Sequence, residues 1–117
     1  MSRKIEFRGL NHKGIWVYGI PNLFSTQGDD GVMWSDAEYI YQFSLKTLGQ
    51  YTGMKDKNGV KIFEGDIVFH YCLGVLQIIF EQGRFLAISE DDELDSHIFK
   101  TFKVIGNVWE NPELLVV

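Results

Sequence analysis

Hydrophobic and polar residues alternate in short runs along this chain, and clusters of Gly, Asn and Asp separate the runs. Alternation with a period of two is typical of half-buried β-strands, and the separating residues favour tight turns. The pattern predicts seven or eight short strands. We place them at residues 5–7, 15–18, 39–43, 61–63, 67–71, 75–81, 84–88 and 99–109.

Two dipeptides between these runs predict hairpins. Asn58-Gly59 favours a two-residue type I′ turn, in which both central residues have positive φ. Gln82-Gly83 separates two apolar runs and predicts another hairpin. Residues 11–14 predict the turn that joins the first two strands.

The pattern is less regular in the first half of the chain. Pro21 interrupts it, and the polar residues 25–31 predict a flexible loop. Residues 39–43 favour a strand, although Ser35 or Asp36 could cap a short helix instead. Residues 44–49 predict either a further strand or an irregular link.

The C-terminal segment predicts a short helix. Asn111 suits the N-cap position, Pro112 the first helical position, and Glu113 the positive end of the helix. Gly106 precedes it and marks a bulge or a close approach of two backbones. We therefore expect a mainly β fold (β-rich α+β): a small antiparallel sheet or an SH3-like barrel with a short C-terminal helix.

Composition adds a domain prediction and a question about the aromatic residues. The 117 residues fit one compact domain, residues 1–117, that can bury a core without metals or disulfides. Nine Phe, five Tyr and three Trp are many for this length. We expect most of these rings in the core; the alternative is that some form a contact surface.

The net charge of −5 comes from one segment. Residues 90–95 contain five acids, and the rest of the chain carries eleven acids and eleven bases. This balance does not supply the basic face of a generic nucleic-acid binder. We expect a solvated acidic loop; the alternative is a mimic of the phosphate backbone that blocks a DNA-binding protein.

The sequence predicts no metal site and no cofactor. His12, His70 and His97 are scattered, and Asp56 and Asn58 lack the further ligands of a calcium loop, so we expect an Asx turn there. Cys72 lies in an apolar run and predicts a small buried side chain.

One carboxylate pair raises the question of catalysis. Glu64 and Asp66 lie two residues apart and could act as an acid–base pair in a hydrolase. We expect instead that one of them binds backbone N–H groups of the turn. The sequence contains neither an apolar run of membrane-spanning length nor a signal peptide, which predicts a cytoplasmic protein in whatever cell makes it.

Three ordered blocks of sequence carry a family resemblance. They contain FRG at 7–9 and GIWVYG at 14–19, then GQYTG at 49–53, KDKNG at 55–59 and IFEGDIV at 62–68, and finally VIGNVWENPEL at 104–114. The chain resembles the YopX family, small proteins found mostly in phages and prophages. Met54 replaces a usual Leu, and residues 29–43 and 90–96 match no motif.

The resemblance implies a β-rich accessory protein and supplies no catalytic or binding residues. We expect a non-enzymatic protein-binding or regulatory module with an unknown protein partner, and homo-oligomers are compatible with it. The alternative is a small barrel that binds nucleic acid in a groove lined by Tyr51, Lys55, Lys57 and Lys61. The candidate partner-binding residues are Tyr51, Lys55, Lys57, Glu64 and Asp66.

Overall fold

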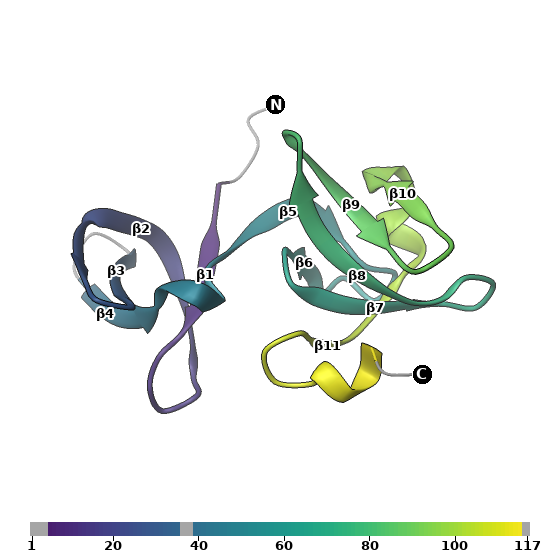
Figure 1. Cartoon of the computed structure of the whole chain (residues 1–117). Coiled ribbons are helices and arrows are strands. Elements are labelled where there is room, and N and C mark those ends of the chain that lie inside the picture. The colour runs from purple at the N-terminus through teal and green to yellow at the C-terminus, as the bar shows by residue number, and fades with distance from the viewer. Residues whose placement is uncertain (1–4, 36–38, 116–117) are drawn as a thin grey trace. The chain divides into compact units, whose positions relative to one another are not determined.

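The structure is a computed structural model that describes residues 5–35 and 39–115. It is mainly β, and its strands form two antiparallel sheets (Figure 1). The chain divides into two compact units, residues 1–51 and residues 52–117. We describe each unit separately.

The first unit contains a hairpin-connected antiparallel sheet. Its strands are β1 (Phe7–Leu10), β2 (Trp16–Gln27), β3 (Asp30–Ser35), β4 (Tyr39–Ser44) and the beginning of β5 (Gly49–Lys55), with a 3-10 helix, η1 (Leu45–Thr47), before β5. The strand order is β4-β3-β2-β1-β5, and the later part of β5, in the second unit, neighbours β6.

The packing of the described core of the first unit depends on two glycines. Among the side chains that the structure describes there, Val17, Met33 and Phe43 form a buried apolar cluster. A Cβ atom on Gly9 would lie 2.3 Å from the Phe43 ring, and one on Gly31 would lie 3.0 Å from it. Such distances are too short for carbon atoms in contact, so only glycine lets β1 and β3 pack against this ring.

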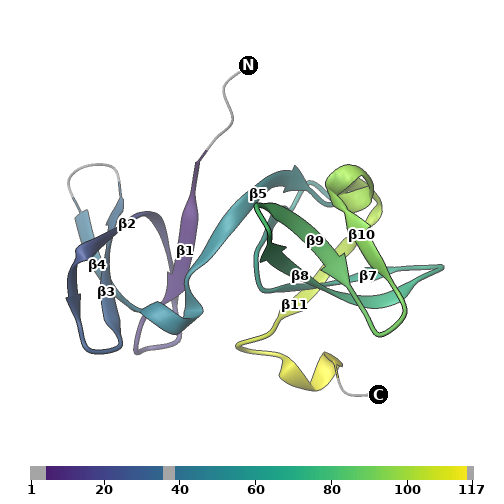
Figure 2. The same ribbon diagram turned by 45° about the horizontal axis from the view of Figure 1, so that its top comes forward.

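The second unit contains the other sheet. Its elements are β6 (Lys61–Phe63), β7 (Asp66–His70), β8 (Gly74–Glu81), β9 (Arg84–Ile88), β10 (Glu93–Asp95), η2 (Ser96–Thr101), β11 (Lys103–Asn107) and η3 (Pro112–Leu115). The strand order is β10-β9-β8-β7-β11. The 3-10 helix η2 packs beside β9 and β10 (Figure 2).

Alternating residues of this sheet form the larger core. Val68, Leu76, Ile78 and Ala87 share one face, because Val68 pairs with Leu76 and Ile78 pairs with Ala87. They are fully buried, and the rings of Phe99 and Phe102 pack against them. Burial alternates along β8, whereas consecutive residues are buried in β7 and β9.

The two predicted hairpins exist, but the turn type at the first was wrong. At residues 56–60 only Gly59 has positive φ, and its N–H donates to the carbonyl of Asp56. This is a three-residue loop with an ordinary turn followed by a left-handed glycine. The positive-φ pair occurs at Gln82 (φ 52°) and Gly83 (φ 80°).

The loop predicted in the first half of the chain was also wrong. Strand β2 continues through Pro21 to Gln27, and β3 begins at Asp30, so only a short turn separates them. Strand β2 pairs with β1 only as far as Gly19. At Pro21 that edge of β2 therefore has no partner strand, so the missing N–H of proline is tolerated.

Other local predictions met mixed outcomes. The irregular link at residues 44–49 is η1, whereas Asp36 and its predicted cap lie outside the described residues. The register of β11 shifts between Val104 and Gly106, which confirms the bulge. Residues 99–101 belong to η2 rather than to a strand.

The C-terminal helix and the environment of Cys72 differ from expectation. The helix is the 3-10 turn η3, and the side chain of Asn111 accepts a bond from the N–H of Asn107 instead of capping η3. Cys72 is exposed, because the apolar run around it bends into the β7–β8 turn. The described strands do not close into an SH3-like barrel.

Candidate interaction face

The predicted partner-binding residues of the lysine groove lie in different environments. Tyr51, in the first unit, is only 6% exposed. Lys55 and Lys57 are exposed in the second unit, on β5 and in the turn that follows it. Lys61 is half-buried on β6. Since the ring of Tyr51 is buried, it does not present a stacking surface for a base.

The carboxylates of Glu64 and Asp66 occupy the turn before β7. Asp66 is 1% exposed, and its Oδ2 accepts a hydrogen bond of 2.7 Å from the N–H of Phe63. The expectation that one of the pair binds the turn backbone is thus confirmed for Asp66. Glu64 is half-buried. Neither residue lines the two hollows described next.

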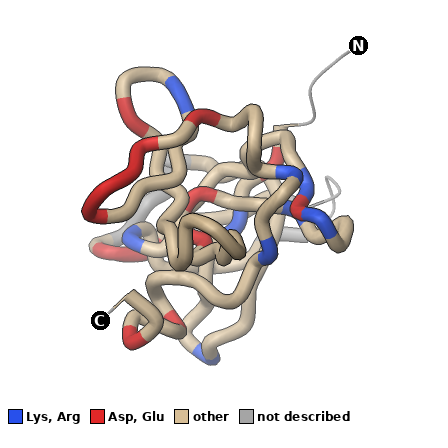
Figure 3. The backbone as a smooth tube through the Cα atoms, turned by 90° about the vertical axis from the view of Figure 1, so that its right-hand side faces the viewer, with Lys and Arg blue, Asp and Glu red and all other residues tan. Residues whose placement is uncertain are grey.

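The acidic loop borders an open hollow of about 380 Å³ in the second unit. Its apolar part is Ile79 and Ile88, and its rim carries Glu81 and the acidic residues 90–93. Figure 3 shows the acidic run as a continuous red segment. Among the residues that the structure describes, no three His, Cys, Asp or Glu side chains form a metal-binding group. Glu90 and Asp91 are exposed, as expected for a solvated loop.

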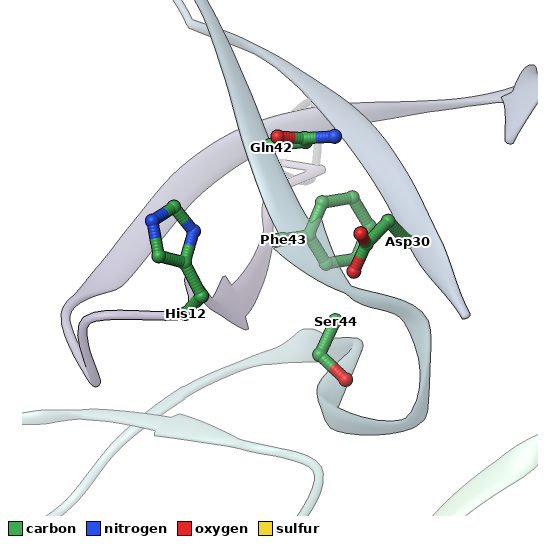
Figure 4. A pocket seen from close by; sticks show the side chains of 5 residues that line it. All are labelled: His12, Asp30, Gln42, Phe43 and Ser44. Atoms are coloured by element: carbon green, nitrogen blue, oxygen red, sulfur yellow. The ribbon is translucent and has the colours of Figure 1, made fainter. Parts of the chain in front are cut away.

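A small hollow in the first unit contains the residue types of a catalytic triad. His12, Asp30 and Ser44 line it together with Gln42 and Phe43, and its volume is about 50 Å³ (Figure 4). The hydroxyl of Ser44 points away from both the His12 ring and the Asp30 carboxylate. A nucleophile and its base must lie within hydrogen-bond reach, so this arrangement is not that of an activated serine.

Three large apolar side chains share the outer face of the first sheet. Ile20 of β2 pairs directly with Trp34 of β3, and Tyr18 lies two residues before Ile20 on the same face. Tyr18 is 43% exposed, Ile20 50% and Trp34 47%. We call these three residues the aromatic face.

The described neighbours of the aromatic face include two charged residues next to β2, Arg8, which pairs with Tyr18, and Glu6, which continues that register beside Ile20. On the same side lie Trp16 and Asn22 of β2 and Val32 of β3. Arg8 pairs with Tyr18, but it is only 7% exposed and its guanidinium carbon lies 4.2 Å from the centre of the Trp16 ring. Tyr18, Ile20 and Trp34 are thus exposed apolar side chains beside half-buried polar ones, Glu6 and Asn22.

Gly19 brings the two strands of the aromatic face close together. Its φ is +150°, and a Cβ atom there would lie 2.0 Å from the carbonyl oxygen of Trp34. Only glycine permits this approach of β2 to β3. The backbone thus fixes the position of Tyr18 relative to Trp34.

Sequence reasoning did not identify the aromatic face. The signal was the run Trp16-Val17-Tyr18-Gly19-Ile20, in which both alternating sets are apolar. One set, with Val17, enters the core, and the other set remains exposed. An apolar outer set is the feature that distinguishes a contact surface from a solvated strand.

Comparison with known proteins gives a family and a similar structure. The family model described as YopX protein matches residues 7–116. The chain is similar to the crystal structure of protein EF1440 from Enterococcus faecalis, with 28% sequence identity and a TM-score of 0.63. That match covers 97% of this chain and 99% of the other.

A search of curated proteins found no match. Within the described residues, no helix has the length and apolar character needed to cross a membrane.

Proposed function

The chain belongs to the YopX family, and from this membership and the aromatic face we propose that it is a non-enzymatic accessory protein of a phage or prophage. It acts in the host cytoplasm by binding another protein. The observation that carries the proposal is the exposure of Tyr18, Ile20 and Trp34 side by side on one sheet face. A contiguous apolar surface of this kind gains free energy when a partner removes it from water.

The charge distribution supports a protein partner over nucleic acid. The first unit, which bears the aromatic face, has five basic and five acidic residues. The second unit has six basic and eleven acidic residues, so it carries the whole net charge of −5. Neither unit has the excess of basic residues that draws a protein to a phosphate backbone.

A capture experiment tests the proposal. The wild-type protein and the Trp34→Ser variant are immobilised and exposed to nuclease-treated bacterial lysate. The matched control is Tyr71→Ser, because Tyr71 is 84% exposed in the second unit. We expect a retained protein that the control also retains and that Trp34→Ser loses. Equal retention by all three proteins would contradict a role for the aromatic face.

Light scattering during gel filtration distinguishes the partner from a second copy. If the face mediates self-association, wild type elutes as an oligomer and Trp34→Ser has a smaller mass. The partner is then another copy of this chain. A monomeric wild type that retains a host protein supports a heterologous partner.

A further inference from the structure

We infer that Asn58 is a site of spontaneous deamidation and that the carboxylate of Asp56 controls how fast this modification occurs. The inference concerns the loop between β5 and β6 and does not depend on the proposed function. It follows from the exposure of Asn58, the open space around Gly59 and the hydrogen bonds that Asp56 makes across the loop.

The reaction is an attack of the backbone on a neighbouring side chain, and asparagine is a labile residue for this reason. The backbone nitrogen of Gly59 loses its proton to hydroxide and forms a bond to Cγ of Asn58. The Cγ–Nδ2 bond of Asn58 breaks, and Nδ2 takes a proton from water and leaves as ammonia. Water then opens the resulting cyclic imide at either carbonyl group, which yields aspartate or isoaspartate at position 58.

The loop makes the reacting atoms accessible. Asn58 and Gly59 are both exposed, so hydroxide and water reach them from solvent. A Cβ atom on Gly59 would meet no described atom within 4 Å outside its chain neighbours, so the imide has room to form. Glycine also has no side chain that hinders its nitrogen, and its backbone adopts many conformations. The nitrogen of Gly59 can therefore reach Cγ of Asn58 once the loop opens.

The native loop restrains the attacking nitrogen. The N–H of Gly59 donates to the main-chain carbonyl of Asp56 at 3.0 Å, which shields its proton from base. Oδ1 of Asp56 accepts the N–H groups of Asn58 and Val60 at 2.8 and 2.9 Å, so the backbone is fixed on both sides of that nitrogen. Deamidation therefore requires an open form of the loop, and its rate follows the population of that form.

The bonds of Asp56 also extend beyond the loop, which makes opening more costly. Its Oδ2 accepts the N–H of Val104 at 2.9 Å. The N–H of the next residue, Lys57, donates to the carbonyl of Phe102 at 2.9 Å. Opening separates these partners and leaves polar groups of a buried region without their bonds. Removal of the carboxylate should lower this cost and speed the modification.

The modification should in turn weaken the loop. Isoaspartate adds a carbon atom to the backbone between residues 58 and 59. The N–H of Asp56 donates to the carbonyl of Val60 at 2.8 Å, and the N–H of Val60 donates back to Oδ1 of Asp56. We expect the longer loop to lose at least one of these bonds. Either product also places a second carboxylate two residues from Asp56, and like charges repel.

Incubation of the full-length protein in mildly alkaline buffer tests the inference. Peptide mapping by mass spectrometry measures the replacement of NH₂ by OH at each asparagine, and chromatography separates the aspartate and isoaspartate peptides. Asn11 is the internal control, because it also lies in a turn but precedes His12 rather than glycine. We expect conversion at position 58 and none at Asn11. Conversion should be at least about tenfold faster in urea, because the unfolded loop is always open.

Variants assign the rate to the loop. Asp56→Ala should deamidate at least about fivefold faster than wild type in native buffer, because it loses the bonds that close the loop. Leu76→Ala is the matched control, since it destabilises the buried core and leaves the loop bonds in place. In urea, Gly59→Ala should slow the conversion, because a side chain then hinders the nitrogen.

Four results would overturn the inference. An unfolded chain that does not convert, or a native chain that never converts, would show that Asn58 is not a deamidation site. Equal rates in native and unfolded protein, or equal acceleration by Leu76→Ala and Asp56→Ala, would show that Asp56 does not control the rate. Amide hydrogen exchange of Val104 should be faster in the isoaspartate fraction, and an unchanged exchange rate would reject the weakening of the loop.

Discussion

The carboxylate of Asp56 connects two distant segments of the second unit. Its Oδ1 accepts bonds from the N–H groups of Asn58 and Val60, at 2.8 and 2.9 Å. Its Oδ2 accepts a bond of 2.9 Å from the N–H of Val104. Asp56 is 5% exposed, so water cannot easily replace these bonds. The predicted Asx turn is confirmed, and it has an additional long-range partner.

Replacement of Asp56 by Asn should lower the free energy of unfolding by about 2 kcal/mol, because an amide N–H₂ would face the N–H of Val104. Asp56→Ala, which removes both acceptor oxygens and all three bonds, should lower it by about 3 kcal/mol. Urea denaturation measures both values. The exposed Asp91→Asn serves as the control and should change the free energy by less than about 0.5 kcal/mol. Equal stability of all variants would show that the bonds contribute nothing.

The ionisation of Asp95 responds to its neighbour His97. The backbone N–H of His97 donates to its carboxylate at 3.0 Å, and the His97 ring lies 2.8 Å away. These bonds, and a smaller contribution from Arg84, lower the pKa of Asp95 below its ordinary value of 3.8. A lowered folded-state pKa stabilises the fold above pH 3.8, and the contribution disappears as the pH falls through the folded-state pKa.

His97→Ala should raise the pKa of Asp95 part of the way toward 3.8, because the ring contact is lost and the backbone bond remains. Carboxyl-carbon NMR titration of the two proteins measures the change. An identical titration curve in the variant would mean that the His97 ring contributes nothing and that the backbone N–H and Arg84 cause the shift.

At the scale of elements, the β8–β9 hairpin has a residue poorly suited to its turn. Gln82 has φ of 52°, a left-handed conformation in which a longer side chain is strained. Asn tolerates this conformation and is preferred at the first position of a type I′ turn. We expect Gln82→Asn to raise stability by about 0.5–1 kcal/mol.

Thermal unfolding checks this prediction through the melting temperature. Gln77→Asn on β8 is the matched control, and it should lower the melting temperature because Asn is unfavourable within a strand. A melting temperature of Gln82→Asn below that of wild type would mean that Gln82 makes a favourable contact in the turn.

The elements show which features a single sequence can predict. Short apolar runs bounded by turn residues located β7, β8 and β9 to within one residue at each end. The turn type at Asn58-Gly59 was not predictable from the dipeptide, since the Asp56 side chain determines it through bonds to Asn58 and Val60. Pro21 within β2 was not predictable, because its tolerance depends on where pairing with β1 ends.

The candidate site was harder to predict from the sequence than the fold was. Both alternating sets of residues 16–20 are apolar, and periodicity alone does not tell which set is buried. Ile20 and Trp34 become neighbours only through the register of β2 and β3. The charged and aromatic residues favoured from sequence lie elsewhere, and Tyr51 is buried.

At the scale of the whole molecule, the prediction of one domain implies that residues 1–117 unfold cooperatively. Among the side chains that the structure describes, the buried cluster of the first unit has three apolar residues and that of the second has eight, so the first unit has the smaller described core. Strand β5 is continuous through the boundary: Gln50 pairs with Phe7, and the hydroxyl of Thr52 donates to the carbonyl of Ile62.

We therefore expect one unfolding transition for residues 1–117. Trp16 and Trp34 report on the first unit and Trp109 on the second, so variants that retain one of these residues, with Phe at the others, can be compared by fluorescence in urea. All of these variants should unfold at one urea midpoint, once the effect of each Phe substitution on stability has been subtracted. A lower midpoint for the Trp34 signal would mean that the first unit unfolds separately.

The bond between Asp56 and Val104 also has a consequence for the lifetime of the native state. It joins residues 48 positions apart, with β6 to β10 between them. Closure of so long a segment costs more chain entropy than the pairing of nearer strands, so we expect this bond to form after the rate-limiting step of folding. Stopped-flow measurements should find that Asp56→Asn unfolds faster and refolds at nearly the wild-type rate. One carboxylate would then determine how long each folded molecule persists, while contributing little to how fast it forms.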